Sequence, residues 1–143
     1  MAQFKVNWFL LIIILILVAV TTLPYIIAAS AAGDSYVFVG FLFNPLDGNS
    51  YLAKMRQGLE GRWRFTLSYT AEPSNGAYLF IFYLLLGHLS RIIGWSNPIT
   101  FHVVRVICST LMLVSLYYFL KTVLINKLQL RIAYLLAVFG SGI

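Results

Sequence analysis

Long apolar stretches alternate with one polar stretch along this chain of 143 residues. Residues 6–33 carry no charged side chain, and a helix of that length measures about 42 Å, more than the ~30 Å hydrocarbon core of a bilayer. The pattern predicts a transmembrane helix over about 6–33. A cleaved signal peptide is the alternative, because "AASAAG" offers small residues suited to cleavage, although the run is about twice the usual ~7–15 residue signal core.

Residues 34–76 form the polar stretch, and the turn clusters "NPLDG" and "EPSNG" lie within it. Between these clusters, the pattern predicts a short helix over 48–60, with Asp47 at its cap and Gly61 ending it. Because an amphipathic helix after a membrane span lies on the bilayer surface, we expect an interfacial helix here. Helical spacing places three apolar side chains on one face: Leu52, Met55 and Leu59.

The next apolar segment, residues 77–95, is ambiguous between a full crossing and an interfacial helix. It begins uniformly apolar, but Gly87, His88, Ser90 and Arg91 interrupt its second half. Just before it, "GRWRF" has the pattern of a membrane-interface anchor, made by Trp63 and Phe65.

"WSNPITF" predicts the start of a helix, with Asn97 as its cap and Pro98 at its first position. The apolar run that follows predicts a transmembrane helix over about 98–125, and a further one starts from about 130. Three bases lie in or beside the short loop between them: Lys121, Lys127 and Arg131.

The positive-inside rule places this basic loop in the cytoplasm, and Lys5 places the N-terminus there too. Two cytoplasmic ends require an even number of crossings between them, which 6–33 and 98–125 already supply. We therefore expect 77–95 to lie at the outer face, within an outer loop over 34–96. A full crossing by 77–95 would instead place the three bases outside.

Composition strengthens this interpretation. Only 10% of the residues are charged, against roughly 25% in ordinary soluble domains, and the mean hydropathy is +0.89. The expected fold is an all-α, multi-pass integral membrane protein whose outer-face loop carries short interfacial helices. A net charge of +6 then reflects topology and contact with the lipid bilayer, not nucleic acid. Cys108 is the single cysteine, which excludes an internal disulfide.

Four stretches occur in an order that resembles the GT-C superfamily of polyprenyl-phosphate-sugar-dependent glycosyltransferases: "DGNSYLAKMRQGLEGRW", "EPSNGAYLFIFYLLLG", "FHVVRVICSTLMLVSLYYFL" and "LRIAYLLAVFGSGI". The order is similar to the mannosyl- and aminoarabinose-transferase branch. Two positions depart from it: a paired acid is replaced by Asp47-Gly48, and a Lys-Pro-Pro element by "AEPSNG". These departures leave the acceptor and the subfamily undefined.

The resemblance implies that residues 1–143 are the N-terminal part of a GT-C-like transmembrane domain. The end of the chain within the apolar run "YLLAVFGSGI" leads to the same expectation. The implied activity is inverting transfer of a sugar from a polyprenyl-phosphate donor to an acceptor at the outer membrane face. We expect this part alone to be inactive.

Such a transfer needs a carboxylate that takes the proton of the acceptor. The resemblance assigns this catalytic role to Asp47, for which a plain helix cap is the alternative. Glu72 is a second candidate, for the acceptor or for a divalent metal, with a solvated loop acid as its alternative. Asp34 and Glu60 are expected to be solvated. The lipid-linked sugar is the expected donor, and a divalent metal is the one further cofactor left open. The histidines His88 and His102 lack ligand partners at motif spacing.

The leaving phosphate needs cations. Arg105 lies inside an apolar helix, where an unpaired charge costs a few kcal/mol, so it is a candidate for substrate binding unless it snorkels to the interface. Lys54 and Arg56 are candidates for phosphate contact, with lipid contact as the alternative. Tyr51 joins the substrate-binding candidates because it shares a helix face with Asp47 and Lys54.

Two non-catalytic functions remain as alternatives. A transporter or flippase segment would show polar or broken helices within the membrane, whereas this chain concentrates its polarity outside the apolar runs. A structural membrane subunit would tolerate Asp47→Ala in the complete protein.

Overall fold

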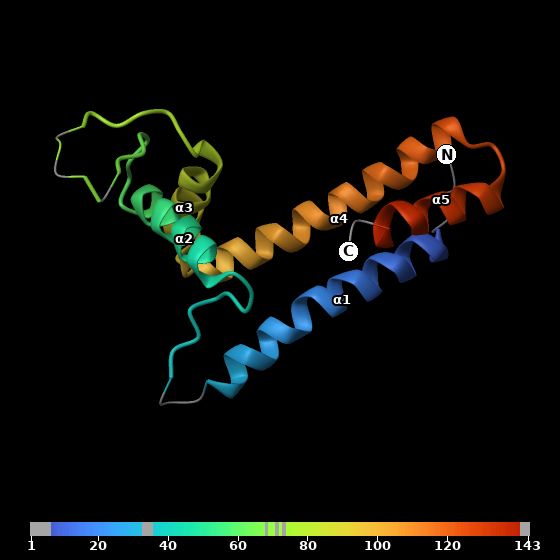
Figure 1. Cartoon of the computed structure of the whole chain (residues 1–143), viewed down its shortest axis with the longest axis horizontal. Coiled ribbons are helices and arrows are strands. Elements are labelled where there is room, and N and C mark those ends of the chain that lie inside the picture. The colour runs from blue at the N-terminus through green and yellow to red at the C-terminus, as the bar shows by residue number, and fades with distance from the viewer. Residues whose placement is uncertain (1–6, 33–35, 68, 71, 73, 141–143) are drawn as a thin grey trace. The chain divides into compact units, whose positions relative to one another are not determined.

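The computed structural model describes residues 7–32, 36–67, 69–70, 72 and 74–140. Within these ranges the regular structure is helical, and the only strand-like pairing is an isolated antiparallel bridge between Phe65 and Ala77. The all-α prediction is therefore confirmed. Figure 1 labels the helices in chain order: α1 (Trp8–Ala31), α2 (Pro45–Leu59), α3 (Ile81–Ile93), α4 (Asn97–Val123) and α5 (Lys127–Phe139).

The chain divides into two compact units. The first unit comprises Met1–Thr22 and Arg105–Ile143, and the second comprises Leu23–Val104. Helices α1 and α4 each contribute residues to both units, whereas α2 and α3 belong to the second and α5 to the first.

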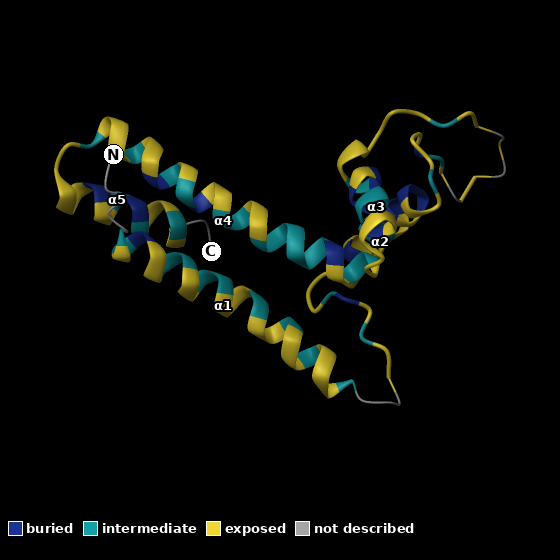
Figure 2. Cartoon of the chain, turned by 180° about the vertical axis from the view of Figure 1, so that it is seen from behind, coloured by how far each residue is buried: buried dark blue, intermediate teal, exposed yellow. Residues whose placement is uncertain are grey.

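Two of the described helices, α1 and α4, are long and apolar enough to cross a membrane. At 1.5 Å per residue they measure about 36 Å and about 40 Å, against a hydrocarbon core of ~30 Å. Helix α1 continues through Pro24 to Ala31. Most of its large apolar side chains are exposed, as Figure 2 shows in yellow, including Trp8 at 68% and Ile27 at 64%. Such apolar exposure in water is costly, and lipid would remove that cost.

The first unit is built on a small aromatic and aliphatic core from α1, α4 and α5. Tyr134 is fully buried, and its ring meets those of Phe9 and Tyr117 edge-on at 6.0 and 5.6 Å. The tyrosine hydroxyl donates to the Leu113 carbonyl at 3.3 Å, which satisfies the one polar group that Tyr134 buries. The buried members of this core are Leu10, Leu113, Tyr117, Leu130 and Tyr134.

In the second unit, α2 and α3 pack against each other almost backbone to backbone. A Cβ atom at Gly58 would lie 2.1 Å from the Leu84 carbonyl oxygen, and one at Gly87 would lie 1.9 Å from the Met55 carbonyl oxygen. Met55 and Leu84 are almost wholly buried, at 0% and 1% exposure. The two glycines therefore allow α2 and α3 to cross closely enough to bury Met55 and Leu84.

A buried hydroxyl pair connects α3 to the start of α4. The Ser90 hydroxyl donates to Thr100 Oγ1 at 2.8 Å, and the two side chains are 0% and 1% exposed. The predicted Asn97 cap is not formed: its side-chain oxygen is buried and has no hydrogen-bond partner among the described residues. Helix α4 instead begins at Asn97 itself.

The turn after α2 follows the prediction that Gly61 ends the helix. Gly61 has a φ of 91°, its amide donates to Gly58 O, and the Arg62 amide donates to Gln57 O. This paired hydrogen bonding is the Schellman motif, in which the glycine adopts the left-handed conformation at little cost. The start of the helix differs from the prediction, as it lies at Pro45 and not at 48.

The Gln57 side chain holds the segment that follows. Its amide nitrogen donates to Thr66 O at 2.9 Å, and its oxygen accepts from Thr66 N at 2.9 Å. Next to Thr66, Phe65 is 7% exposed and packs edge-on against Phe80 at 5.0 Å. The prediction that Phe65 anchors the chain in lipid is therefore wrong, because its ring is used inside the unit. Trp63 stays 59% exposed.

Helix α3 has 13 residues and is about 20 Å long, too short to cross a ~30 Å hydrocarbon core. Of the predicted apolar face of α2, only Met55 is fully buried, while Leu59 is 37% exposed. The other buried residues of α2 are Gly48, Lys54, Gln57 and Gly58. The Phe41 ring covers Gly48, and α3 approaches at Gly58.

Candidate functional site

Asp47 lies in the first turn of α2 with its carboxylate exposed. It is the third helical residue and not the cap; Asn44, at a φ of 48°, occupies the cap position, so the predicted capping role is wrong. The Asn44 side-chain amide donates to Asp47 Oδ2. The N-terminal end of the helix also favours a negative charge at this position. One carboxylate oxygen is thus oriented by Asn44, and the group faces outward from the unit.

An aromatic ring supports the backbone beside Asp47. A Cβ atom at Gly48 would lie 2.2 Å from Cγ of Phe41, so glycine is required for this ring to lie against α2. The Phe41 ring in turn meets Phe101 edge-on at 5.1 Å. The Phe41 ring therefore lies between the first turn of α2 and Phe101 of α4 and supports the backbone next to the carboxylate.

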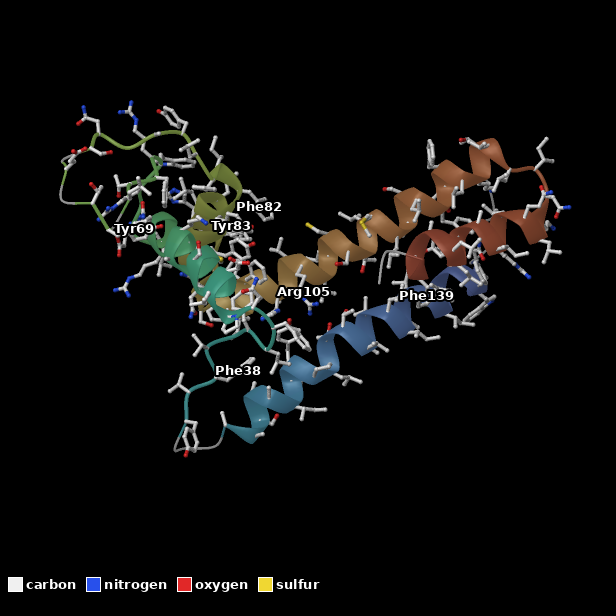
Figure 3. The ribbon with its side chains drawn as sticks, viewed as in Figure 1. Phe38, Tyr69, Phe82, Tyr83, Arg105 and Phe139 are labelled. Atoms are coloured by element: carbon white, nitrogen blue, oxygen red, sulfur yellow. The ribbon has the colours of Figure 1, made fainter. Side chains whose placement is uncertain are left out.

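One helical turn beyond Asp47, Tyr51 stands in a stack of rings. It lies parallel to Tyr83 at 4.8 Å and 3°, and nearly parallel to Phe101 at 6.2 Å and 10°. Burial raises the pKa of Tyr83, and the neighbouring Tyr51 raises it further. The Tyr83 phenol is therefore protonated at neutral pH and acts as a hydrogen-bonding group. Figure 3 labels Tyr83 on α3.

Lys54 is buried, at 9% exposure. Its ammonium group donates to Ser50 Oγ at 2.8 Å and lies 4.3 Å from the ring centre of Phe80, with Tyr51 and Tyr83 at 5.3 and 5.7 Å. Aromatic faces thus stabilise the charge in place of a carboxylate. Lys54, which was predicted as a candidate for phosphate contact, therefore lies within the interface between α2 and α3. Phe80 and Tyr83 come from a different segment, so the spacing within α2 gave no signal of the arrangement.

Arg56 lies on the exposed side of α2. Its Nε lies 3.3 Å from Glu60 Oε1, and Arg62 lies 3.4 Å from the other carboxylate oxygen. Glu60 was expected to be solvated. It is exposed to solvent, and it also forms ion pairs with Arg56 and Arg62. Arg56 and Glu60 border an open groove of about 650 Å³, whose other lining residues are Leu52, Ala53, Leu59, Ser96, Asn97 and Pro98.

Glu72 is exposed in the loop before α3, where its amide donates to Thr70 Oγ1 at 3.2 Å. Asp34 and Lys5, which entered the predictions for charge and topology, lie outside the described residues.

Arg105 belongs to the first unit, apart from the α2 residues of the second. It leaves α4 toward α1, as Figure 3 shows, and donates to Thr21 O at 3.1 Å and to Thr22 Oγ1 at 3.3 Å. The side chain therefore links two apolar helices by hydrogen bonds. It also borders a cavity of about 450 Å³ lined mainly by apolar side chains of α1, α4 and α5.

The histidines pack among aromatic rings. His102 Nε2 lies 2.6 Å from Gly40 O, and its ring lies 4.6 Å from that of Tyr25. The His88 ring stacks on Trp63 at 4.1 Å. Over the described ranges, no three His, Cys, Asp or Glu side chains gather to hold a metal ion.

Asp47, Tyr51 and Lys54 thus all belong to α2, where Lys54 lies near the Tyr51 ring, whereas Glu72 belongs to the loop before α3 and Arg105 to the first unit. Sequence analysis missed Asn44, which orients Asp47, and the rings of Phe80 and Tyr83 around Lys54. Comparisons with protein-family models, with curated proteins and with solved structures found no match to this chain.

Proposed function

We propose that this chain is the N-terminal part of an integral membrane glycosyltransferase, which transfers a sugar from a polyprenyl-phosphate donor to an acceptor at the outer membrane face. The observation that carries the proposal is the exposed Asp47 carboxylate, oriented by Asn44 at the first turn of a helix packed in a fixed position. The resemblance to the GT-C superfamily places the catalytic base at the same residue.

Membrane insertion is the first part of the proposal. Helices α1 and α4 have the length and apolar composition of membrane spans, and their apolar side chains lie largely exposed. In the proposed topology both cross the bilayer, and the short helices α2 and α3 lie at its outer interface. A donor whose prenyl tail is in lipid would present its phosphate and sugar at that depth.

The chemical step follows from the position of Asp47. As the acceptor oxygen attacks the anomeric carbon of the sugar, its proton passes to the carboxylate, and the bond between that carbon and the phosphate oxygen breaks. Attack from the face opposite the phosphate inverts the anomeric centre. Negative charge develops on the leaving phosphate, which a cation must stabilise. Arg56 is exposed on the same helix, but it lies nine residues from Asp47 and so on the opposite face, and it does not supply this cation to a substrate held at Asp47. Lys54 contributes by holding α2 and α3 together through its aromatic contacts.

The test is a transfer assay with the full-length protein in lipid vesicles. A polyprenyl-phosphate-linked sugar carrying a label is supplied together with a crude acceptor fraction. We expect label in the acceptor and release of polyprenyl phosphate in equal amounts. Binding of the donor without its consumption would instead favour the non-catalytic, lipid-binding alternative.

The topology makes a separate prediction. With Cys108 replaced by serine, a single cysteine at Asn75 should react with a membrane-impermeant maleimide added to intact cells, and one at Ile125 should react only after the cells are opened. Ile125 is fully exposed between α4 and α5, and its use spares Asn126, whose side chain caps α5 by accepting from the Leu128 amide. Labelling of the Ile125 site from outside would show that the segment 77–95 crosses the membrane.

A further inference from the structure

A basic cavity lies in the first unit, which contains none of the proposed catalytic residues of α2. It measures about 520 Å³ and opens between the ends of α1, α4 and α5. Its lining combines three cations, two hydrogen-bonding side chains and three apolar ones: Lys121, Lys127, Arg131, Asn7, Tyr117, Leu124, Ile125 and Leu130.

No acid of this unit can neutralise these cations. The four acids of the chain are Asp34, Asp47, Glu60 and Glu72, and all fall within residues 23–104, the second unit. Three like charges around one cavity repel one another, and a bound anion would offset this repulsion more directly than solvent and salt do.

The lining is held in place by other contacts. The Asn7 side-chain amide donates to the Tyr117 hydroxyl at 2.5 Å, across α1 and α4. The Arg131 guanidinium lies 5.3 Å from the ring centre of Phe9, and Lys121 lies 5.9 Å from that of Tyr118. Lys127 and Arg131 are one helical turn apart, so both project from the same face of α5.

We infer that this cavity binds the phosphate of an anionic phospholipid at the inner face of the membrane. The cations and the Tyr117 hydroxyl can donate hydrogen bonds to the phosphate oxygens. The apolar side chains can contact the glycerol and the first acyl carbons: Leu124, Ile125 and Leu130. This inference rests on the membrane insertion proposed above, but not on sugar transfer.

A general attraction between basic loops and anionic membranes is the simpler account of such residues. It depends on the number of charges near the surface and not on their exact places. The double substitution Lys127→Gln/Gln129→Lys separates the two accounts, because it keeps the net charge of α5 and moves one cation from the cavity lining to an exposed position outside it.

The experiment compares retained lipid after purification of the full-length protein in mild detergent from vesicles of phosphatidylcholine with added phosphatidylglycerol. Native mass spectrometry counts the bound phosphatidylglycerol. Each of Lys121→Gln, Lys127→Gln and Arg131→Gln should weaken retention about fivefold, the effect of removing one cation near an anionic lipid. The relocated-charge variant should lose as much as Lys127→Gln alone, and Arg64→Gln in the second unit should lose nothing.

Equal retention by the relocated-charge variant and the unmodified protein would overturn the inferred site in favour of general surface charge. Displacement of the lipid by millimolar inorganic phosphate would overturn the assignment to a lipid and leave a phosphate site. Alkaline extraction of the same membranes reports insertion separately: a protein that is extracted disproves the proposed insertion, and the inferred site with it.

Discussion

Replacing Asp47 with asparagine should lower sugar transfer by the full-length protein by about 10²–10⁴-fold, the usual contribution of a general base. Asparagine has nearly the same size, and its carbonyl oxygen can still accept the hydrogen bond from the Asn44 amide. It cannot take the acceptor proton at neutral pH. The loss should therefore fall on turnover, measured as initial rates of label transfer in vesicles with saturating donor.

The matched control is Asn49→Ala, two residues further along α2. It removes an exposed polar side chain from the same part of the helix and should keep the unmodified rate. Alkaline extraction of both variants should match the unmodified protein, and their free energies of unfolding should stay within about 1 kcal/mol of it, because Asp47→Asn loses only the interaction of the charge with the helix end. Full turnover by Asp47→Asn would remove the assignment of the catalytic base.

The second large effect is structural and is expected at Gly87. Alanine is the better helix former, by about 1 kcal/mol, so local propensity predicts that Gly87→Ala stabilises α3. The structure predicts the opposite sign. The new methyl group would lie 1.9 Å from the Met55 carbonyl oxygen, and a helix backbone cannot turn away as a flexible side chain would. We expect a net loss of about 2 kcal/mol or more, near the upper range for overpacking.

Gly94→Ala provides the comparison for this prediction. It adds the same methyl group at the end of α3, where nothing lies within 4 Å, so it reports only the cost of a φ of 80°, about 1–2 kcal/mol. Denaturant unfolding in detergent measures both. It is followed by the fluorescence of Trp63, which stacks on His88 of α3, with Trp8 and Trp95 replaced by phenylalanine in all compared proteins. An increase in stability for Gly87→Ala would show that α2 and α3 do not approach this closely.

The sequence predicted the long helices well, because a continuous apolar run is a local property. The end of α2 at Gly61 was predictable for the same reason, since a glycine after a helix has a direct conformational use. Contacts between segments were not. Lys54 and Phe65 looked like surface residues in their own segments, and Phe80, which lies far along the chain, makes both part of the interior.

The first turn of α2 shows the same limit on a smaller scale. A cap at Asp47 was the ordinary expectation for an acid before a helix, yet the helix starts three residues earlier than predicted, at Pro45. Proline is suited to a first helical position, and that signal was present in "NPLDG". The aromatic support under Gly48 could not be predicted, because it depends on Phe41 from the preceding loop.

The double hydrogen bond of Gln57 to the backbone of Thr66 also bears on how this region can vary in length. One side chain is hydrogen-bonded to both the N–H and the C=O of a single residue. An insertion or deletion between positions 58 and 65 would therefore bring a different residue to Gln57. It would also shift the bridge between Phe65 and Ala77. Positions 67–76 come after Thr66, so a change of length there leaves the spacing from Gln57 to Thr66 unchanged. Homologous chains should therefore keep the spacing from Gln57 to Thr66 constant and differ in length after it.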